Sequence, residues 1–232
     1  MTRLFDRLNR YYRRHDIHPL EFQCIHRASC AAGCAKFTEA KASLVGSEYG
    51  DPIRIVVLSL DPGSCFDPPR DRTLEAIQAK QSRERVEKLH KGHHWYRTHE
   101  TVAALLSLFD TEFTAAEAAC RFAHVNAAKC THNLPARKQA PTHLFENCRP
   151  YLEGELAILA PEIVVTQGDR AAAVIEPWTK RGTVKNLVEM GDRTFYWLRL
   201  VHPTAWGGAY GREKKTWPRQ FGRAKKWIDA QA

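Results

Sequence analysis

The sequence has no long apolar run. None of its stretches approaches the roughly 20 apolar residues of a membrane-spanning helix, and Met1 to Asp16 holds no apolar signal core. Asp6 and Asp16 also argue against a transit peptide, and no internal repeat or low-complexity tract occurs. We therefore expect a cytoplasmic protein with no membrane partner.

Acidic residues are fewer than basic ones. The 232 residues include 35 Lys plus Arg against 26 Asp plus Glu, which gives a net charge of +9. Such an excess favours a polyanionic partner, with nucleic acid the first expectation, although it can also serve solubility alone. We expect one monomeric domain over residues 1–232, with a basic helix at residues 2–15 and a cysteine-rich segment inside an N-terminal extension, residues 1–50.

Export signals are absent, so the cysteines are not expected to form a disulfide framework. Their number is odd, and ligation of a metal or cluster competes with plain burial as the explanation. The seven cysteines lie at positions 24, 30, 34, 65, 120, 130 and 148.

Four apolar segments predict the strands of a sheet, and helical patterns separate them. The expected strands are Ile53 to Leu60, Arg121 to Ala128, Glu162 to Gln167 and Thr194 to Val201. The expected helices are Arg72 to Lys91, Thr101 to Phe109, Thr114 to Ala119, Pro141 to Leu159, Asp169 to Ile175 and Glu213 to Ala230, the last with a start that Pro218 delays. This alternation predicts an α/β fold, a three-layer α/β/α sandwich with a mainly parallel four-stranded central sheet.

Polar residues of distinct chemistry lie near the ends of three of these strands. Asp61 comes directly after the first strand, Asn126 lies within or just after the second, and His202 follows the fourth. Because parallel strands end at one edge of a sheet, these side chains could converge on one ligand. Each alone is equally explained as a turn-forming or structural residue.

The ordered motifs around these residues resemble the uracil-DNA glycosylase superfamily. SLDPG at 59–63, HVNAAKC at 124–130 and LVHPTAW at 200–206 carry the resemblance, with the segment from Cys148 to Ala173 between them. The resemblance spans roughly residues 24 to 226 and is strongest to the iron–sulfur-containing members, but the first motif has an Asp-Pro pair. It implies a DNA repair enzyme that flips uracil out of DNA and hydrolyses its N-glycosidic bond, leaving an abasic site.

The resemblance also implies roles for single residues. As catalytic residues, Asp61 would stabilise the sugar cation and position water, and His202 would donate to the departing base. In substrate binding, Asn126 would read the edge of uracil, Phe66 would stack on the base, and Gly63 would shape the turn. A core position is the alternative for Phe66.

A loop after His202, AWGGAYGREKK, combines glycines, aromatic residues and positive charge. We expect Trp206 or Tyr210 to press into the duplex while Arg212, Lys214 and Lys215 contact phosphate. Core packing and ordinary solvation are the alternatives.

Four cysteines fit the thiolate ligands of a [4Fe-4S] cluster. Cys30, Cys34, Cys130 and Cys148 are the best set, and Cys24 could replace one of them. Zinc or no metal at all are the alternatives. The expected partner is DNA containing uracil or abasic sites, whereas a non-catalytic relative that binds damaged DNA, or an enzyme for hypoxanthine, would use the same pocket.

A group of histidines lies at and just beyond the end of the helix expected at residues 72–91. His90, His93, His94 and His99 lie among charged residues without a defined ligand spacing. We interpret them as a solvated or DNA-facing surface rather than a metal site.

Overall fold

The computed structural model describes residues 2–34, 36–63, 66–133, 140–179 and 186–231, and a six-stranded sheet runs through its centre. In spatial order the strands are β2 (Leu44–Val45), β4 (Phe122–Asn126), β3 (Ile55–Ser59), β6 (Ile163–Gln167), β8 (Arg193–Leu200) and β7 (Leu187–Met190). A separate two-stranded sheet pairs β1 (Lys36–Thr38) with β5 (Thr131–Asn133).

The four predicted strands form the parallel centre of the large sheet. β4, β3, β6 and β8 pair in parallel, whereas β2 and β7 pair antiparallel at the two edges. The mainly parallel sheet is therefore confirmed, but it has six strands in the described residues rather than four. Both missed strands are short and lie at an edge, where apolar patterning is weakest.

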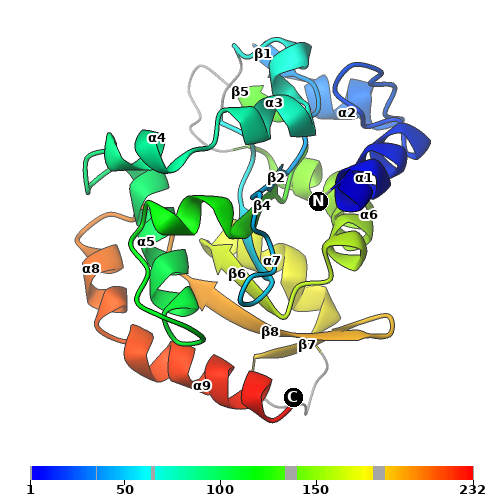
Figure 1. The fold of residues 1–232 in the computed structure, drawn as a ribbon. Helices are drawn as coiled ribbons and strands as arrows, with labels where there is room; N and C mark the ends of the chain where they lie inside the picture. Colours follow the sequence, from blue (N-terminus) through cyan, green and yellow to red (C-terminus); the bar gives the residue numbers. More distant parts are fainter. Residues whose placement is uncertain (1, 35, 64–65, 134–139, 180–185, 232) are drawn as a thin grey trace.

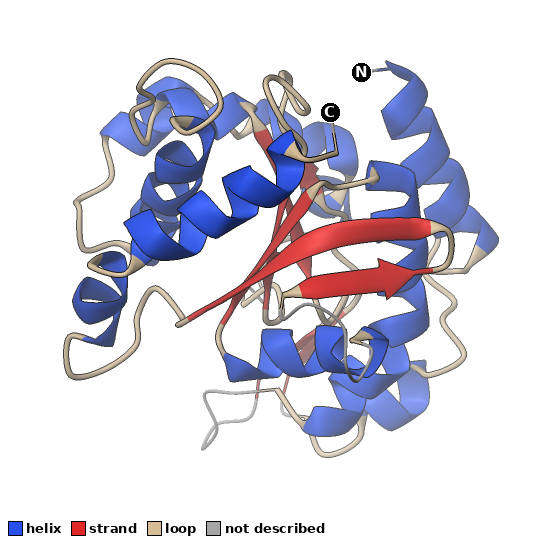
Figure 2. Ribbon diagram, turned by 90° about the horizontal axis from the view of Figure 1, so that it is seen from below, coloured by secondary structure: helices blue, strands red, loops and turns tan. Residues whose placement is uncertain are grey.

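Helices cover both faces of the sheet (Figures 1 and 2). Val56 and Leu58 of β3 belong to the same buried cluster as residues of α1 (Thr2–Arg14), α6 (Thr142–Leu159) and α7 (Asp169–Ile175). Ile55 and Val57, which point the other way, pack with α5 (His94–Leu106) and α9 (Trp217–Asp229). This alternation along one strand confirms the three-layer α/β/α sandwich.

The helix expected at residues 72–91 is divided into two short helices. Thr73 caps α3 (Leu74–Ala79) by accepting a hydrogen bond from the Ala76 N–H, and Ser82 caps α4 (Arg83–Glu87) in the same way. Pro218 lies in the first turn of α9, which begins at Trp217, so the expected delay is confirmed. The remaining short elements are α2 (Arg27–Ala31), α8 (Ala209–Lys214), η1 (Pro69–Arg72), η2 (Glu117–Cys120) and η3 (Glu176–Trp178).

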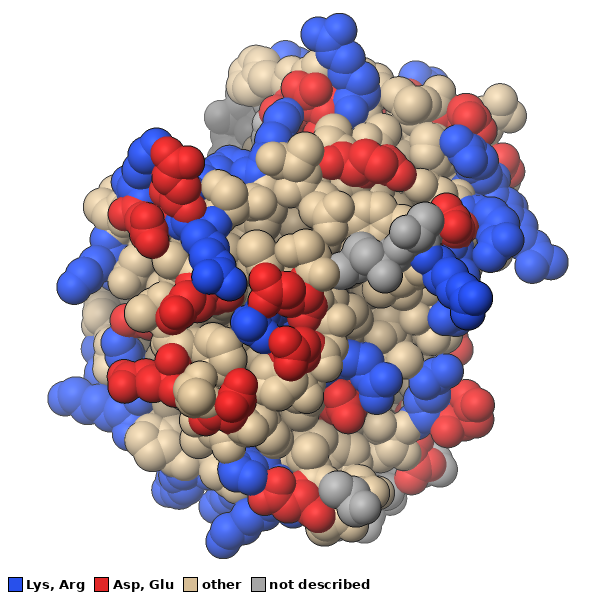
Figure 3. Space-filling view, viewed as in Figure 1, with Lys and Arg blue, Asp and Glu red and all other residues tan. Residues whose placement is uncertain are grey.

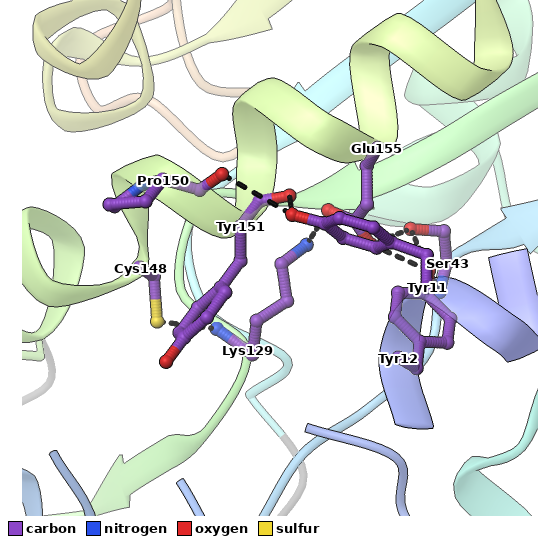
Figure 4. Close-up of polar contacts among 8 residues, drawn as sticks. All are labelled: Tyr11, Tyr12, Ser43, Lys129, Cys148, Pro150, Tyr151 and Glu155. Atoms are coloured by element: carbon purple, nitrogen blue, oxygen red, sulfur yellow. Dashed lines mark hydrogen bonds and ion pairs between the residues drawn. The ribbon is translucent and has the colours of Figure 1, made fainter. Parts of the chain in front are cut away.

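A buried polar network anchors the N-terminal helix (Figure 4). The Tyr12 hydroxyl donates to Glu155 Oε1 at 2.6 Å, the Ser43 hydroxyl donates to the same oxygen at 2.9 Å, and the Lys129 ammonium bonds Glu155 Oε2. Glu155 is fully buried and Lys129 is 2% exposed. The expected basic helix at residues 2–15 is therefore confirmed as α1 and is fixed to α6 through its inner face. Within the described ranges, no helix is long and apolar enough to cross a membrane.

Candidate active site

The carboxyl ends of the parallel strands bring the three predicted polar residues to one edge of the sheet. Asn126 is the last residue of β4 and lies opposite Ser59 of β3, and the pairing continues as the Ala127 N–H donates to the Ser59 carbonyl at 2.9 Å. Asp61 is in the turn that follows directly. One strand, β6, separates β3 from β8, so His202 lies about 10 Å across the sheet from the Asp61 strand.

The Asp61 carboxylate is half-buried. Burial raises the pKa of Asp61 above its ordinary value, and the N–H groups of Asp61 and Gly63 and the positive fields of His132 and Arg170 oppose that rise. Gly63 has φ +70°, which favours glycine, and this turn aims its N–H at the carboxylate. The site thus holds a partly desolvated carboxylate, a group suited to stabilising a nearby positive charge.

The His202 ring is oriented by its own turn. Its Nδ1 accepts the Thr204 backbone N–H at 3.2 Å and lies 2.8 Å from the Thr204 hydroxyl. Because a backbone N–H can only donate, neutral His202 carries its proton on Nε2. Burial lowers the pKa of His202, which favours this neutral form. Gly168, at φ +96°, allows its backbone to lie close to His202, since a Cβ on Gly168 would be 3.4 Å from the His202 Cβ.

A cleft of about 440 Å³ opens beside this edge of the sheet. Asn126, which is 5% exposed, lines it together with Pro62 from the Asp61 turn. His94 lines the same cleft, and its pKa is lowered by burial and by the neighbouring His93 and His202. Asn126 therefore lines the cleft, whereas Asp61 and His202 do not; Asp61 precedes the lining residue Pro62, and His202 is close enough to the lining residue His94 to lower its pKa.

Phe66 and the aromatic side of the cleft differ from expectation. Phe66 is 80% exposed, does not line the cleft, and has the Lys36 ammonium 3.8 Å from its ring centroid. The aromatic residue in the cleft lining is Trp95, which packs edge-on against His124 with ring centroids 4.9 Å apart. Sequence reasoning missed Trp95 because it lies in the first turn of a helix, far from every motif.

A hydrogen-bond chain supports the cleft and was also missed. The Ser59 and Thr98 hydroxyls both donate to Gln167 Oε1 at 3.1 Å. Because the Ser59 proton points to Gln167, His124 donates from Nε2 to Ser59 at 2.8 Å. Burial lowers the pKa of His124 to about 3. Strand alternation was the available signal, since His124 and Asn126 are two residues apart and share one face of β4.

The histidine group is not one solvated surface. His93 and His94 stack on each other and line the cleft. His99 is fully buried, donates to the Trp95 carbonyl at 2.7 Å and lies 2.6 Å from Gln81 Nε2. Burial lowers the pKa of His99 to about 4. The interpretation as a solvated surface is wrong for His99.

The loop after His202 is only partly as expected. Trp206 is 92% exposed, as a residue that enters a duplex must be. Tyr210 is instead buried, and its hydroxyl reaches the Arg97 carbonyl at 3.0 Å and Glu100 Oε2 at 2.9 Å, so the prediction that Tyr210 presses into DNA is corrected.

The three basic residues of this loop are exposed. Lys214 forms an ion pair with Glu100 at 2.6 Å, and Arg212 donates to the Gly207 carbonyl. Lys215 has no such contact within the described residues. That these side chains contact phosphate stays a prediction.

Four cysteines line a second, smaller cavity, at the junction of the N-terminal segment and α6. They are Cys24, Cys30, Cys130 and Cys148, so Cys24 takes the place expected for Cys34. The Cys30 sulfur accepts from Asn147 Nδ2 and the Cys148 sulfur accepts from the Lys129 backbone N–H, both at 3.3 Å. Burial first, and then the neighbouring cysteines, raise the pKa of the Cys130 thiol.

The arrangement of the donor atoms decides which metal group this cavity fits. Across the described ranges, no three His, Cys, Asp or Glu residues are grouped closely enough to hold one metal ion. A zinc ion needs all its sulfurs about 2.3 Å from a single centre. In a [4Fe-4S] cluster each thiolate binds its own iron, so the ligands stand further apart. A set of four cysteines around one cavity, with N–H donors to the sulfurs, suits the cluster better.

The fold defines the class of the protein, an open α/β protein, and proteins of this class bind ligands at the carboxyl ends of their parallel strands. A sequence model of the Uracil DNA glycosylase superfamily matches residues 47–221, and the chain belongs to this superfamily. Its members are DNA glycosylases, hydrolases that act in DNA repair. A comparison with curated proteins gives no match. The matched region contains Asp61, Asn126 and His202, whereas α1, Cys24 and Cys30 precede it.

Proposed function

We propose that this protein is a DNA glycosylase that removes uracil and leaves an abasic site. The observation that carries the proposal is the joint placement of Asp61, Asn126 and His202 at one sheet edge beside the cleft. The glycosylase must extrude the base and break its bond to C1′ of the sugar. The three side chains supply the groups that this reaction needs.

Asp61 acts on the sugar. As the glycosidic bond breaks, positive charge develops at C1′ and the ring oxygen, and a carboxylate close by stabilises it. The same carboxylate accepts a hydrogen bond from the water that adds to C1′. The partial burial that raises the Asp61 pKa also strengthens this electrostatic effect, because water screens it less.

Asn126 recognises the base. Its carboxamide offers one acceptor and two donors, which match the N3–H and O4 of uracil. Cytosine presents an acceptor and a donor at the same places and leaves both contacts unmade. Burial of Asn126 sharpens this discrimination, since an unpaired polar group is costly in a desolvated site.

His202 acts on the departing base. Its Nε2–H donates to the O2 carbonyl as negative charge develops there. The hydrogen bonds to Nδ1 hold the ring in the required tautomer. Neutral His202 stabilises the uracil anion as a hydrogen-bond donor and keeps its own proton.

The cysteine cavity holds a [4Fe-4S] cluster in this proposal, with Cys24, Cys30, Cys130 and Cys148 as ligands. These four cysteines would hold the cluster through iron–thiolate bonds, which would tie the N-terminal segment to α6 and to the segment after β4. Its role is therefore structural. Substituting Cys24 by Ser should lower bound iron and sulfide, measured chemically, whereas the Cys34→Ser variant should retain both.

DNA is the partner, and Trp206 is the residue that enters the duplex. Its exposure at the tip of the loop after His202 suits a wedge that replaces the flipped base. Lys215 and Arg212 would contact the phosphates beside it. The cleft is larger than a pyrimidine needs, so hypoxanthine is the second candidate base.

The test is single-turnover base release from oligonucleotides that carry one deoxyuridine or one deoxyinosine. We expect wild type to release uracil, and the Asp61→Ala and Asn126→Ala variants to be slower by roughly 100-fold or more. Asp67→Ala, which removes another carboxylate from the cleft lining, is the matched control. Inosine release alone would change the substrate, and release of neither base would leave a DNA-binding protein.

A further inference from the structure

The outer face of α1 carries a straight row of arginines. Arg3, Arg7, Arg10 and Arg14 recur at intervals of four, three and four residues, which places them within about 60° around the helix. All four are exposed, and Figure 3 shows Lys and Arg gathered along the edge of the molecule that α1 forms. We call these four residues the arginine row.

Acidic side chains of the described residues do not neutralise the row. In the described part of the chain none of the four forms an ion pair, whereas their neighbour Arg13 pairs with Glu21 at 3.4 Å. A furrow of about 360 Å³ runs beside the row and is lined by Arg7, Arg10, Tyr11, Arg14 and Ile158. The guanidinium groups thus stand along a concave track between α1 and α6.

The helix that carries the row is held in one orientation. Tyr12 reaches Glu155 from its inner face, Tyr11 donates to the Tyr151 carbonyl at 3.1 Å, and Asn9 donates to Glu75 at 2.7 Å. Of its apolar residues, Leu8 is buried in the core, and Leu4 and Phe5 are partly buried against it. The helix therefore has no apolar face left to insert into a membrane, and its row is available for a charged ligand.

We propose that the arginine row is a second DNA-binding surface that holds the phosphate backbone of undamaged duplex DNA, separate from the cleft. Arg3 and Arg14 are 11 residue steps apart, or about 16 Å along the helix axis, which matches about five base-pair steps. It precedes residues 47–221, the region matched by the superfamily, so it adds to the glycosylase domain. The proposal rests on DNA as the substrate, and not on uracil as the base.

Phosphate contacts without base contacts bind every sequence alike. A glycosylase must search a large excess of undamaged DNA, and contacts of this kind let a protein slide along it. α1 also touches α3 through Asn9 and Glu75, and Ile77 of α3 and its C-cap residue Lys80 line the cleft. The row is thus one helix away from the place where the base would enter.

Fluorescence anisotropy with an undamaged duplex, measured between 50 and 200 mM KCl, tests the proposal. The variant Arg7→Gln/Arg10→Gln/Arg14→Gln removes the three arginines of the furrow. If each contacts one phosphate, the slope of log affinity against log salt should fall by about 2.7, and the affinity at 100 mM KCl should fall about 100-fold.

A matched control lies on the opposite layer of the molecule. Arg219, Arg223 and Lys226 form an exposed row at similar spacing on α9, and changing them to Gln removes the same charge. Equal losses in both variants, or an unchanged slope in the α1 variant, would overturn the proposal in favour of a net-charge effect. Binding of the α1 row to anionic vesicles without binding to duplex would overturn it too.

The same variant separates this inference from the proposed function. At saturating protein, its single-turnover rate of uracil release should equal that of wild type. If wild type releases no uracil, the anisotropy result still decides the role of the row. If uracil release is normal and the salt slope is unchanged, only the second surface is rejected.

Discussion

Two buried or half-buried carboxylates of this protein are treated in opposite ways. Glu155 receives hydrogen bonds from Tyr12 and Ser43 and the ammonium of Lys129, and none of its surface reaches solvent (Figure 4). Asp61 keeps an opening to solvent, and its pKa is raised because backbone N–H groups and distant charges only partly offset its burial. One carboxylate is saturated with partners and the other is left with capacity for a ligand.

This difference distinguishes a carboxylate that stabilises the fold from one that is left to act on a ligand. The Glu155 network joins α1, α6 and the segment after β4, so its groups gain by being fully paired. A group that must stabilise a transition state needs unused capacity, which the fold leaves at a cost in stability. The predictions below test whether each carboxylate behaves as its surroundings require.

The largest effect is expected when the buried Glu155 network loses its cation. Lys129→Met should lower the free energy of unfolding by about 3 to 5 kcal/mol, because it leaves the Glu155 charge buried without its cation. Urea unfolding measures the loss. The double variant Lys129→Met/Glu155→Gln should recover part of it, since no unpaired charge remains. A loss below about 1 kcal/mol in the single variant would mean that Glu155 is not held as an ion.

Removing a donor from the acting site should slow the reaction and leave the fold intact. His202→Phe should lower the single-turnover rate of base release by about 10²- to 10³-fold, as expected when a donor to a developing anion is lost. The unfolding midpoint in urea should change little, because His202 is half-buried. Thr204→Val keeps the ring but removes one partner of Nδ1 and should cost about 10-fold at most. Equal effects of the two variants would contradict a direct role for the imidazole.

The sequence was most informative where the pattern is long and repeated. β3, β4, β6 and β8 were all predicted, because buried parallel strands require nearly continuous apolar residues. β2 and β7 were missed since Leu44–Val45 is only two residues long and β7 alternates buried with exposed positions.

The placement of polar residues at the sheet edge was predictable where a motif ends a strand, as for Asp61, Asn126 and His202, and their roles stay predictions. Side-chain direction was not predictable in loops or between elements. Tyr210 lies among glycines and charges in the sequence, yet its hydroxyl turns inward to Glu100. Cys24 rather than Cys34 lines the cavity. The sequence could not predict this, because the spacing of the cysteines does not say which sulfur faces Cys130. Long-range packing decides both.

A third buried ionisable group, His99, extends the comparison to acid pH. Its folded pKa of about 4 lies below its ordinary value of 6.5, so the unfolded chain binds more protons between these values. The stability that neutral His99 provides is therefore present above pH 6.5 and is lost as the pH falls to 4, by about 3 kcal/mol in total.

His99→Gln should reduce the slope of this part of the stability curve, measured by urea unfolding at a series of pH values, and the slope that remains should come from His124, whose folded pKa is about 3. The exposed His143, changed to Gln, is the control and should leave the slope unchanged. A slope as steep as that of wild type in the His99→Gln variant would assign the acid sensitivity to other groups. Protonation of His99 would also set a second N–H against the Gln81 amide, so the effect should include loss of that contact.

The smallest effect is the most direct test of the comparison, because it concerns the cost of the unsaturated carboxylate itself. The folded pKa of Asp61 is raised, so its contribution favours folding below the ordinary carboxyl pKa and is lost as the pH rises through the folded value. Ionised Asp61 therefore destabilises the protein at neutral pH. Asp61→Asn should raise the melting temperature by a few degrees at pH 7, and the gain should vanish near pH 3, where Asp61 is protonated.

The same change at Glu155, Glu155→Gln, should lower the melting temperature at pH 7, because it removes a paired charge and leaves Lys129 buried alone. Opposite signs from the same chemical substitution would show that the fold stores stability at one carboxylate and sacrifices it for reactivity at the other. A loss of stability in Asp61→Asn would instead make Asp61 a structural turn residue.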